Sequence, residues 1–156
     1  MNPSSNPFQL SPLLVVRDTA RAIDFYVQAL GATEVVRYLN KRDGNISHAD
    51  LALGETRLSV TEEARAWNSD APPSLGGSPV VLQLRVEDVD VVFRRMRDAG
   101  ASVVFPVVEF CGERMGRVRG PFGHLWIVSE RTEELPTEEI RRRRDAWAPP
   151  TRSSKT

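Results

Sequence analysis

The sequence predicts an α+β protein made of two βαβββ modules in tandem, followed by a short C-terminal helix. The first observation is an internal repeat. Residues 16–18 (Val-Arg-Asp) resemble residues 86–88 (Val-Glu-Asp), which lie 70 positions later. Residues 32–36 resemble residues 101–104 at nearly the same distance. The second observation is that the same order of strand and helix signals runs through both halves. Together they indicate an internal duplication with one module in each half.

Changes of composition divide the chain into five parts. Residues 1–7 are polar and proline-rich, and we expect a flexible arm there. Residues 63–78 combine two adjacent prolines with two adjacent glycines, which is typical of a linker. The predicted divisions are the arm 1–7, a first module 8–62, a linker 63–78, a second module 79–130, and a helix with a tail 131–156.

The first module begins with a predicted strand over residues 8–16. Asp18 or Thr19 is the expected cap of a helix that runs to about Leu30, and Gly31 ends it, since glycine tolerates the positive φ of a helix terminus. The core-facing residues of this helix recur at helical spacing: Ala22, Ile23, Tyr26 and Leu30. Three strands follow, with glycine-containing turns between them, at 33–39, 46–53 and 56–62.

The second module repeats this order. A strand over 80–86 leads to Asp88, the expected cap of a helix over 89–99, and Gly100 ends that helix. Its predicted core face is formed by Val89, Val92, Phe93 and Met96. Three strands are predicted after it, at 103–108, 114–119 and 124–129.

A charged segment follows the second module. Residues 137–139 (Thr-Glu-Glu) predict a helix start, because acidic side chains in the first turn suit the helix dipole, and the arginines at 141–144 suit its far end. Ile140 and Trp147 are its candidate packing residues. The neighbouring acids favour a solvated helix face over a nucleic-acid patch.

Composition narrows the functional classes. The 21 basic and 21 acidic residues balance, so we expect no general attraction to nucleic acid or to an anionic membrane. The single cysteine, Cys111, cannot form an internal disulfide and fits the reducing cytoplasm. We predict neither a membrane span nor a secretion signal, because the chain lacks both patterns. The strong preference for arginine over lysine suggests a GC-rich bacterial genome.

Strand alternation predicts two different sheet faces. In the strand 56–62, Leu58 and Val60 point to one side, whereas Arg57 and Ser59 point to the other. One face is uniformly apolar and should meet the helices. The second face mixes aliphatic and polar residues, which suits a ligand cavity, although burial against a partner subunit explains the same pattern.

Several segments carry a resemblance to a known family. They are Pro12-Leu13-Leu14-Val15-Val16-Arg17-Asp18, Ala22-Ile23-Asp24-Phe25-Tyr26, Gly31-Ala32, His48-Ala49-Asp50-Leu51 and Gly116-Arg117-Val118-Arg119-Gly120-Pro121-Phe122-Gly123-His124-Leu125-Trp126. The chain resembles the glyoxalase/bleomycin-resistance/extradiol-dioxygenase group, the vicinal oxygen chelate superfamily. The last segment is similar to its Asp-Pro-Phe-Gly-His-x-Trp hairpin, with Gly120 in place of the aspartate.

The resemblance implies paired βαβββ modules whose sheets curl around a cavity, and usually a homodimer with the site near the subunit boundary. Metal-dependent members hold their ion through His, Gln or Glu at four cavity positions. The matching positions here are Leu13, Ser59, Val81 and Ile127. Three have no donor atom and serine is a poor ligand, so we predict no metal and no cofactor.

The resulting prediction is a cytoplasmic, metal-free, homodimeric protein that binds a bulky, partly aromatic small molecule, an antibiotic or natural product, for resistance or self-protection. Aliphatic side chains would form the floor, aromatic ones the walls, and polar ones would give specificity. The candidate ligand-binding residues are Leu13, Val15, Asp50, Arg57, Ser59, Trp67, Val81, Gln83, Phe110, Met115 and Ile127.

Two alternatives stay open. The first is a metal-independent lyase, isomerase or transferase of the same superfamily that uses the His48 and Asp50 pair, or Glu109, as acid or base. The second is an interaction module whose apolar sheet face is a subunit contact without a ligand. We assign no catalytic residue: Cys111 lacks an obvious base, although Arg114 is near in sequence, and His124 lies in a turn.

Overall fold

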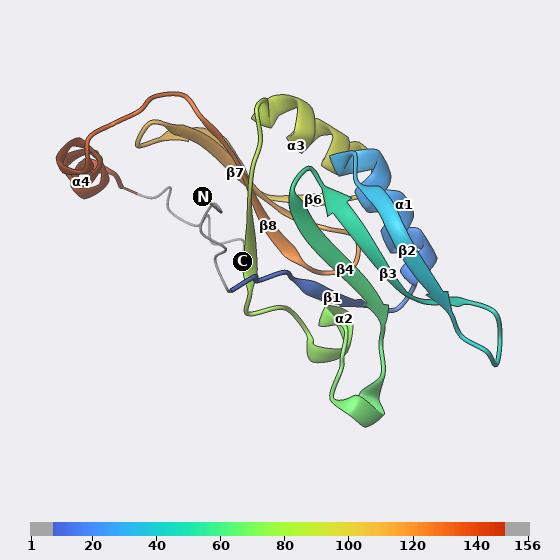
Figure 1. Cartoon of the computed structure of the whole chain (residues 1–156). Helices are drawn as coiled ribbons and strands as arrows, with labels where there is room; N and C mark the ends of the chain where they lie inside the picture. Colours follow the sequence, from blue (N-terminus) through green and yellow to red (C-terminus); the bar gives the residue numbers. More distant parts are fainter. Residues whose placement is uncertain (1–7, 149–156) are drawn as a thin grey trace.

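The computed structural model describes residues 8–148 and contains two four-stranded sheets, with one helix of each module, α1 or α3, packed against its sheet (Figure 1). The predicted arm and the end of the predicted tail lie outside the described residues. The first module consists of β1 (Leu13–Val16), α1 (Thr19–Leu30), β2 (Thr33–Leu39), β3 (Ile46–Leu53) and β4 (Thr56–Glu62). The second consists of β5 (Val81–Arg85), α3 (Val89–Asp98), β6 (Ser102–Phe110), β7 (Glu113–Arg119) and β8 (Leu125–Arg131).

The two sheets share one topology, which confirms the predicted α+β fold of two βαβββ modules. Sheet 1 has the strand order β1-β4-β3-β2 and sheet 2 the order β5-β8-β7-β6. In each sheet the first strand of the module runs parallel to the last, and the other neighbours are antiparallel. The register also repeats, since Leu13 lies opposite Ser59 and Gln83 lies opposite Ile127.

The helices α1 and α3 begin where the sequence predicts. The carboxylate of Asp18 accepts a hydrogen bond from the amide of Arg21 at 3.0 Å, and Asp88 accepts one from Val91 at 3.0 Å. Gly31 ends α1 in the left-handed conformation with φ 68°. These caps satisfy backbone groups that the helix termini leave unpaired. The C-terminal helix α4 (Thr137–Ala146) is also present.

Two details differ from the prediction. The first strand starts at Leu13 instead of residue 8, because Pro12 has no N–H to donate to the ladder, although its carbonyl accepts from Ser59 at 3.0 Å. The linker contains a short 3-10 helix, η1 (Arg65–Trp67), and a single helical turn, α2 (Pro72–Leu75). Proline favours the first turn of a helix, where its missing N–H costs nothing.

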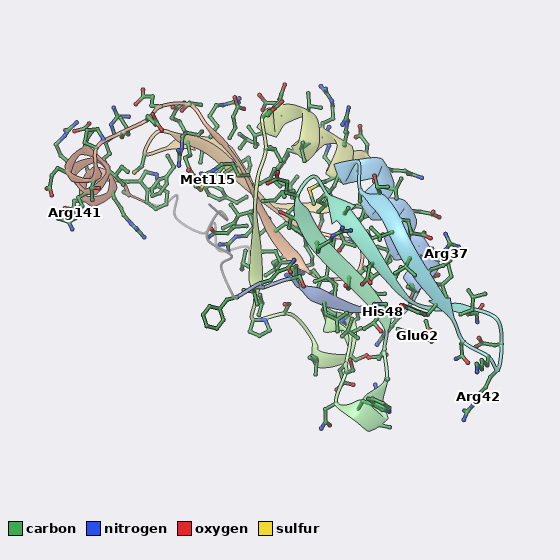
Figure 2. All side chains as sticks on the ribbon, in the orientation of Figure 1. Arg37, Arg42, His48, Glu62, Met115 and Arg141 are labelled. Carbon is green, nitrogen blue, oxygen red and sulfur yellow. The ribbon has the colours of Figure 1, made fainter. Side chains whose placement is uncertain are left out.

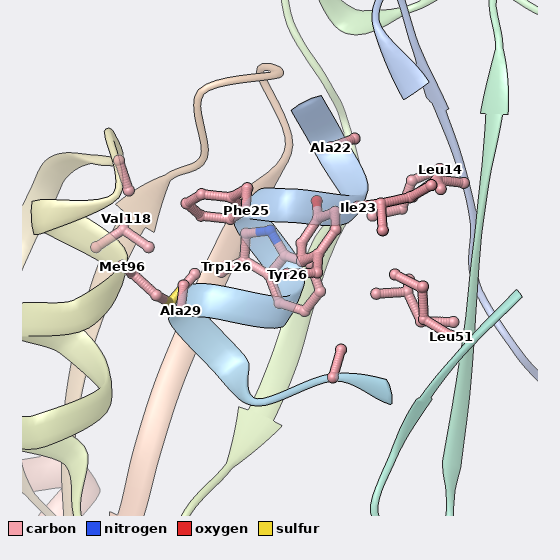
Figure 3. Close-up of a cluster of buried hydrophobic side chains, with 14 of the residues drawn as sticks. Leu14, Ala22, Ile23, Phe25, Tyr26, Ala29, Leu51, Met96, Val118 and Trp126 are labelled. Atoms are coloured by element: carbon pink, nitrogen blue, oxygen red, sulfur yellow. The ribbon is translucent and has the colours of Figure 1, made fainter. Parts of the chain in front are cut away.

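The helices α1 and α3 contact each other, and one continuous core joins both modules. Figure 3 shows α1 between the two sheets, with Ile23 toward Leu14 and Leu51 of sheet 1 and Tyr26 beside Trp126 of sheet 2. The ring centroids of Tyr26 and Trp126 are 5.8 Å apart. The helix-covered faces therefore turn toward this shared core, and the other two faces, here called the outer faces, turn away from it.

Replacement of Trp126 by alanine is expected to lower the free energy of unfolding by about 3–5 kcal/mol, because a large buried ring leaves a cavity at the junction of the modules. Urea denaturation measures the change. The matched control is Trp67→Ala, whose indole is 85% exposed on η1 and should shift stability by less than about 0.5 kcal/mol. Equal effects of the two variants would contradict the assignment of Trp126 to the core.

Candidate functional site

The sheet 2 hollow is an apolar cavity of about 360 Å³ on the outer face of sheet 2. Its apolar lining includes Phe105, Val108, Phe110, Met115, Ile127 and Trp147. The β-ladder produces this grouping, because Met115 lies opposite Val108 and Arg117 lies opposite Ile127. Three predicted ligand-binding residues, Phe110, Met115 and Ile127, are thus brought together in one cavity.

Six residues that line this hollow were not among the predicted ligand-binding residues, and two of them carry side-chain N–H groups that a ligand could use. The first is Trp147, just beyond α4, whose ring centroid lies 4.8 Å from that of Phe110 at an interplanar angle of 76°. This contact agrees with the expectation that α4 packs through Trp147, and Figure 2 shows Met115, on β7, at the side of sheet 2 toward α4. The second is Arg117, which strand alternation places on the same face as Met115.

The sheet 1 hollow, on the outer face of sheet 1, is more polar. It includes three predicted residues, Asp50, Arg57 and Ser59. The Ser59 hydroxyl donates to Asp50 at 2.5 Å, and Nε2 of His48 lies 3.1 Å from the same carboxylate oxygen. Hydrogen bonds from Ser59 first, and from His48 second, lower the pKa of Asp50, so its carboxylate keeps its negative charge at neutral pH.

A third cavity, the junction hollow, lies between β1 and β5 and measures about 310 Å³. It contains Leu13 and Val15 from the first module and His124 from the β7–β8 turn. His124 is buried, its Nδ1 has no hydrogen-bond partner within residues 8–148, and burial lowers the pKa of its imidazole from 6.5 to about 4. The neighbouring Gly123 has φ 94°, and a Cβ there would lie 2.8 Å from Pro72.

The remaining predicted residues lie elsewhere. Trp67 is on η1, away from the three hollows, while Val81 is half-buried and Gln83 exposed on the outer face of β5. Glu109 is exposed and accepts a hydrogen bond from Thr132 at 3.3 Å. Arg114 lies on the helix side of sheet 2, where it pairs with Asp90 at 2.6 Å instead of serving Cys111.

The four positions that match the family's metal ligands do not suit a metal ion. Leu13 and Ser59 face each other across sheet 1, but Val81 is opposite Leu125, and the residue opposite Ile127 is Gln83. If Gln83 is taken as the matching position in place of Val81, the four positions gain one amide oxygen, which is a weak metal ligand. Within residues 8–148, no three His, Cys, Asp or Glu side chains gather in a way that holds an ion. The metal-free state itself stays a prediction.

Within the described residues, no helix has both the length and the apolar composition of a membrane span.

Comparison with known proteins agrees with the fold. The model of the Glyoxalase/Bleomycin resistance protein/Dioxygenase superfamily matches residues 9–128. Uncharacterised proteins of Mycobacterium bovis and Mycobacterium tuberculosis are each 41% identical over 135 residues, which is 84% of this chain and 88% or 79% of theirs.

Solved structures give the same result. TioX from Micromonospora is 28% identical with a TM-score of 0.60, over 83% of this chain and 100% of that protein. A Pseudomonas aeruginosa protein of 21% identity has a TM-score of 0.65, over 81% of this chain and 99% of its own, and at this identity the likeness supports the fold alone.

The buried His124 predicts a measurable pH effect. Its imidazole binds a proton below 6.5 when unfolded but only below about 4 when folded, so stability is complete above pH 6.5 and falls as the pH drops toward 4. The loss amounts to roughly 3 kcal/mol at 1.36 kcal/mol per pKa unit. Urea denaturation of the wild type and of His124→Gln between these pH values measures it. Parallel curves for the two proteins would contradict the assignment.

Proposed function

We propose that this chain, which belongs to the Glyoxalase/Bleomycin resistance protein/Dioxygenase superfamily, is a metal-free binding protein that sequesters a bulky, partly aromatic small molecule. The observation that carries the proposal is the sheet 2 hollow. Its volume of about 360 Å³ lies in the usual range for small-molecule sites, and its walls are mostly apolar with aromatic rings at one end. Such walls attract planar guests through burial and ring contacts.

The residue types at the four family positions support binding over metal-assisted catalysis. Leu13, Val81 and Ile127 offer hydrocarbon surface to a ligand and no donor to an ion. Sequestration needs affinity and no reacting group. The family's description includes bleomycin resistance, so drug binding is within its range. We therefore assign the protein to resistance or self-protection against an antibiotic or another natural product in the cytoplasm of a bacterium.

We also propose that the binding unit is a homodimer. The hollows of the two sheets face away from the shared core, so neither sheet of one chain closes the hollow of the other. Within residues 8–148, the strands β1 and β5 lie at sheet edges and have one neighbouring strand each. Leu13 on β1 and Val80 just before β5 are apolar and are 54% and 60% exposed. A second copy would cover this apolar edge and complete a deeper site between the first module of one copy and the second module of the other.

A second candidate function rests on the hydrogen-bonded group Ser59, Asp50 and His48. The predicted acid/base pair is in contact, which is the minimum for a metal-independent lyase, isomerase or transferase. The lowered pKa of Asp50 weighs against this carboxylate as a base, because a general base works best with a pKa near the operating pH. In this second candidate function, His48 would therefore serve as the base and Asp50 would orient it.

The dimer proposal predicts a solution mass of twice 17.4 kDa by light scattering. Leu13→Arg should produce the monomer, because a buried unpaired charge at the apolar edge is costly. The control, Val27→Arg, places the same charge on the exposed side of α1 and should leave the dimer intact. A wild type that stays monomeric at concentrations well above micromolar would overturn the proposal.

The binding proposal predicts that calorimetric titration with a panel of planar aromatic antibiotics finds at least one ligand of micromolar affinity or better. Phe110→Ala should weaken that ligand by about 10-fold or more, since it removes an aromatic wall of the sheet 2 hollow. The matched control, Trp67→Ala, removes an exposed ring on η1 and should leave the affinity unchanged.

Two results of this titration would contradict the binding proposal. The first is the absence of any binder across a broad panel. The second is chemical conversion of the bound ligand, at a rate that falls in His48→Ala while the affinity persists, which would establish the enzyme alternative.

A further inference from the structure

Arg117 differs from most of the arginines of sheet 2, which pair with an acid. The guanidinium of Arg85 lies 2.6 Å from Glu113, that of Arg114 lies 2.6 Å from Asp90, and that of Arg131 lies 3.7 Å from Glu134. Arg117 and Arg119 have no hydrogen bond or ion pair within the described part of the chain. Of these two, only the half-buried Arg117 lines the sheet 2 hollow, and Arg119 is exposed.

Within residues 8–148, the surroundings of Arg117 offer it no free carboxylate. Its cross-strand neighbours are Phe105 and Ile127, and the remaining lining of the hollow is apolar apart from backbone. The acid nearest along its own strand face, Glu113, is held by Arg85. A partly desolvated charge without a partner is unfavourable, so the hollow carries a positive potential that a bound anion would neutralise.

The position of the charge relative to the rings defines a ligand. Phe110 and Trp147 form an aromatic wall, and Arg117 lies on β7 with Met115 between it and the end of β6 that carries Phe110. The planar guanidinium donates two parallel hydrogen bonds to a carboxylate or a sulfonate, a geometry that lysine does not reproduce.

We infer that the ligand of the sheet 2 hollow is an aromatic acid, whose anionic group binds Arg117 while its ring system packs against Phe110 and Trp147. This inference rests on the proposed function and narrows it to one chemical class. Neutral planar compounds fill the same hollow but leave the guanidinium unpaired, so they bind more weakly.

The test uses the full chain and matched pairs of probes. Calorimetry compares naphthalene-2-carboxylate with naphthalene-2-carboxamide, and anthracene-2-carboxylate with its amide, which differ in charge but hardly in shape. The wild type should bind each acid about 10- to 100-fold more tightly than its amide, the range expected for a charge-assisted hydrogen bond. Added salt should reduce this preference, because an accessible ion pair is screened.

Three variants test whether the preference for the acid depends on the guanidinium of Arg117 and not on a change in folding. Arg117→Gln should abolish the preference for the acid and keep the affinity for the amide, and Arg117→Lys should restore part of the preference. The matched control is Arg119→Gln, two residues along the same strand and face, which should keep the full preference. Urea midpoints of all three establish that each is folded.

The outcomes distinguish this inference from the proposed function. Equal affinity of the wild type for acid and amide, or a preference that survives in Arg117→Gln, overturns the assignment of an acidic ligand and leaves the binding function standing. If neither acid and neither amide binds, the result counts against the inference and against the proposed binding function. A salt-dependent preference in the wild type supports the inference even if the Arg117 variants do not fold.

Discussion

The packing of α1 and α3 between the two sheets determines where a ligand can bind. Tyr26 on α1 lies against Trp126 on β8, and this contact joins the cores of the two modules. Because side chains alternate along a strand, a Trp126 that points to the helices forces Ile127 to point outward. The same contact that stabilises the fold therefore directs the aliphatic floor of the sheet 2 hollow away from the core. The two outer faces cannot enclose one cavity within a single chain, since the helices separate them.

The duplicated modules share a topology but present different chemistry on their outer faces. On sheet 1 the carboxylate of Asp50 accepts a hydrogen bond from Ser59 and lies 3.1 Å from Nε2 of His48, so this half-buried acid already has partners inside the protein. On sheet 2 the half-buried Arg117 has none within residues 8–148. A buried or partly buried polar group without a partner is costly, and proteins keep such groups mainly where a ligand supplies the partner. This difference supports the proposal that sheet 2 recognises the ligand and that sheet 1 shapes the cavity of a neighbouring copy.

The sequence predicted what local rules control. The caps Asp18 and Asp88, the apolar helix faces and the two-residue alternation of the strands all depend on neighbours a few positions away, and all are confirmed. Contacts between distant segments were harder to predict. The pairing of Trp147 with Phe110 spans 37 residues and depends on the path of the chain between β8 and α4. Trp67 was expected to form a wall because it is aromatic and lies in a linker, yet η1 holds it in solvent. Nothing in the local sequence around Trp67 indicates whether its ring lines a cavity or lies in solvent.

The electrostatics of the acidic groups favour binding over catalysis. A catalytic carboxylate usually has a raised pKa, which lets it exchange a proton near neutral pH. Here hydrogen bonds from Ser59 and His48 lower the pKa of Asp50, and the ion pair with Arg114 lowers that of Asp90 on α3. Both carboxylates thus serve to hold neighbouring side chains in place. The backbone of Cys111, in the β6–β7 turn, is strained at φ 49°. The neighbouring Gly112 has no room for a side chain, because Leu135 occupies that space, so packing also fixes this turn. The structural roles of these acidic groups, together with an Arg117 that has no partner within residues 8–148, support the proposal that the protein binds a molecule in the sheet 2 hollow without transforming it.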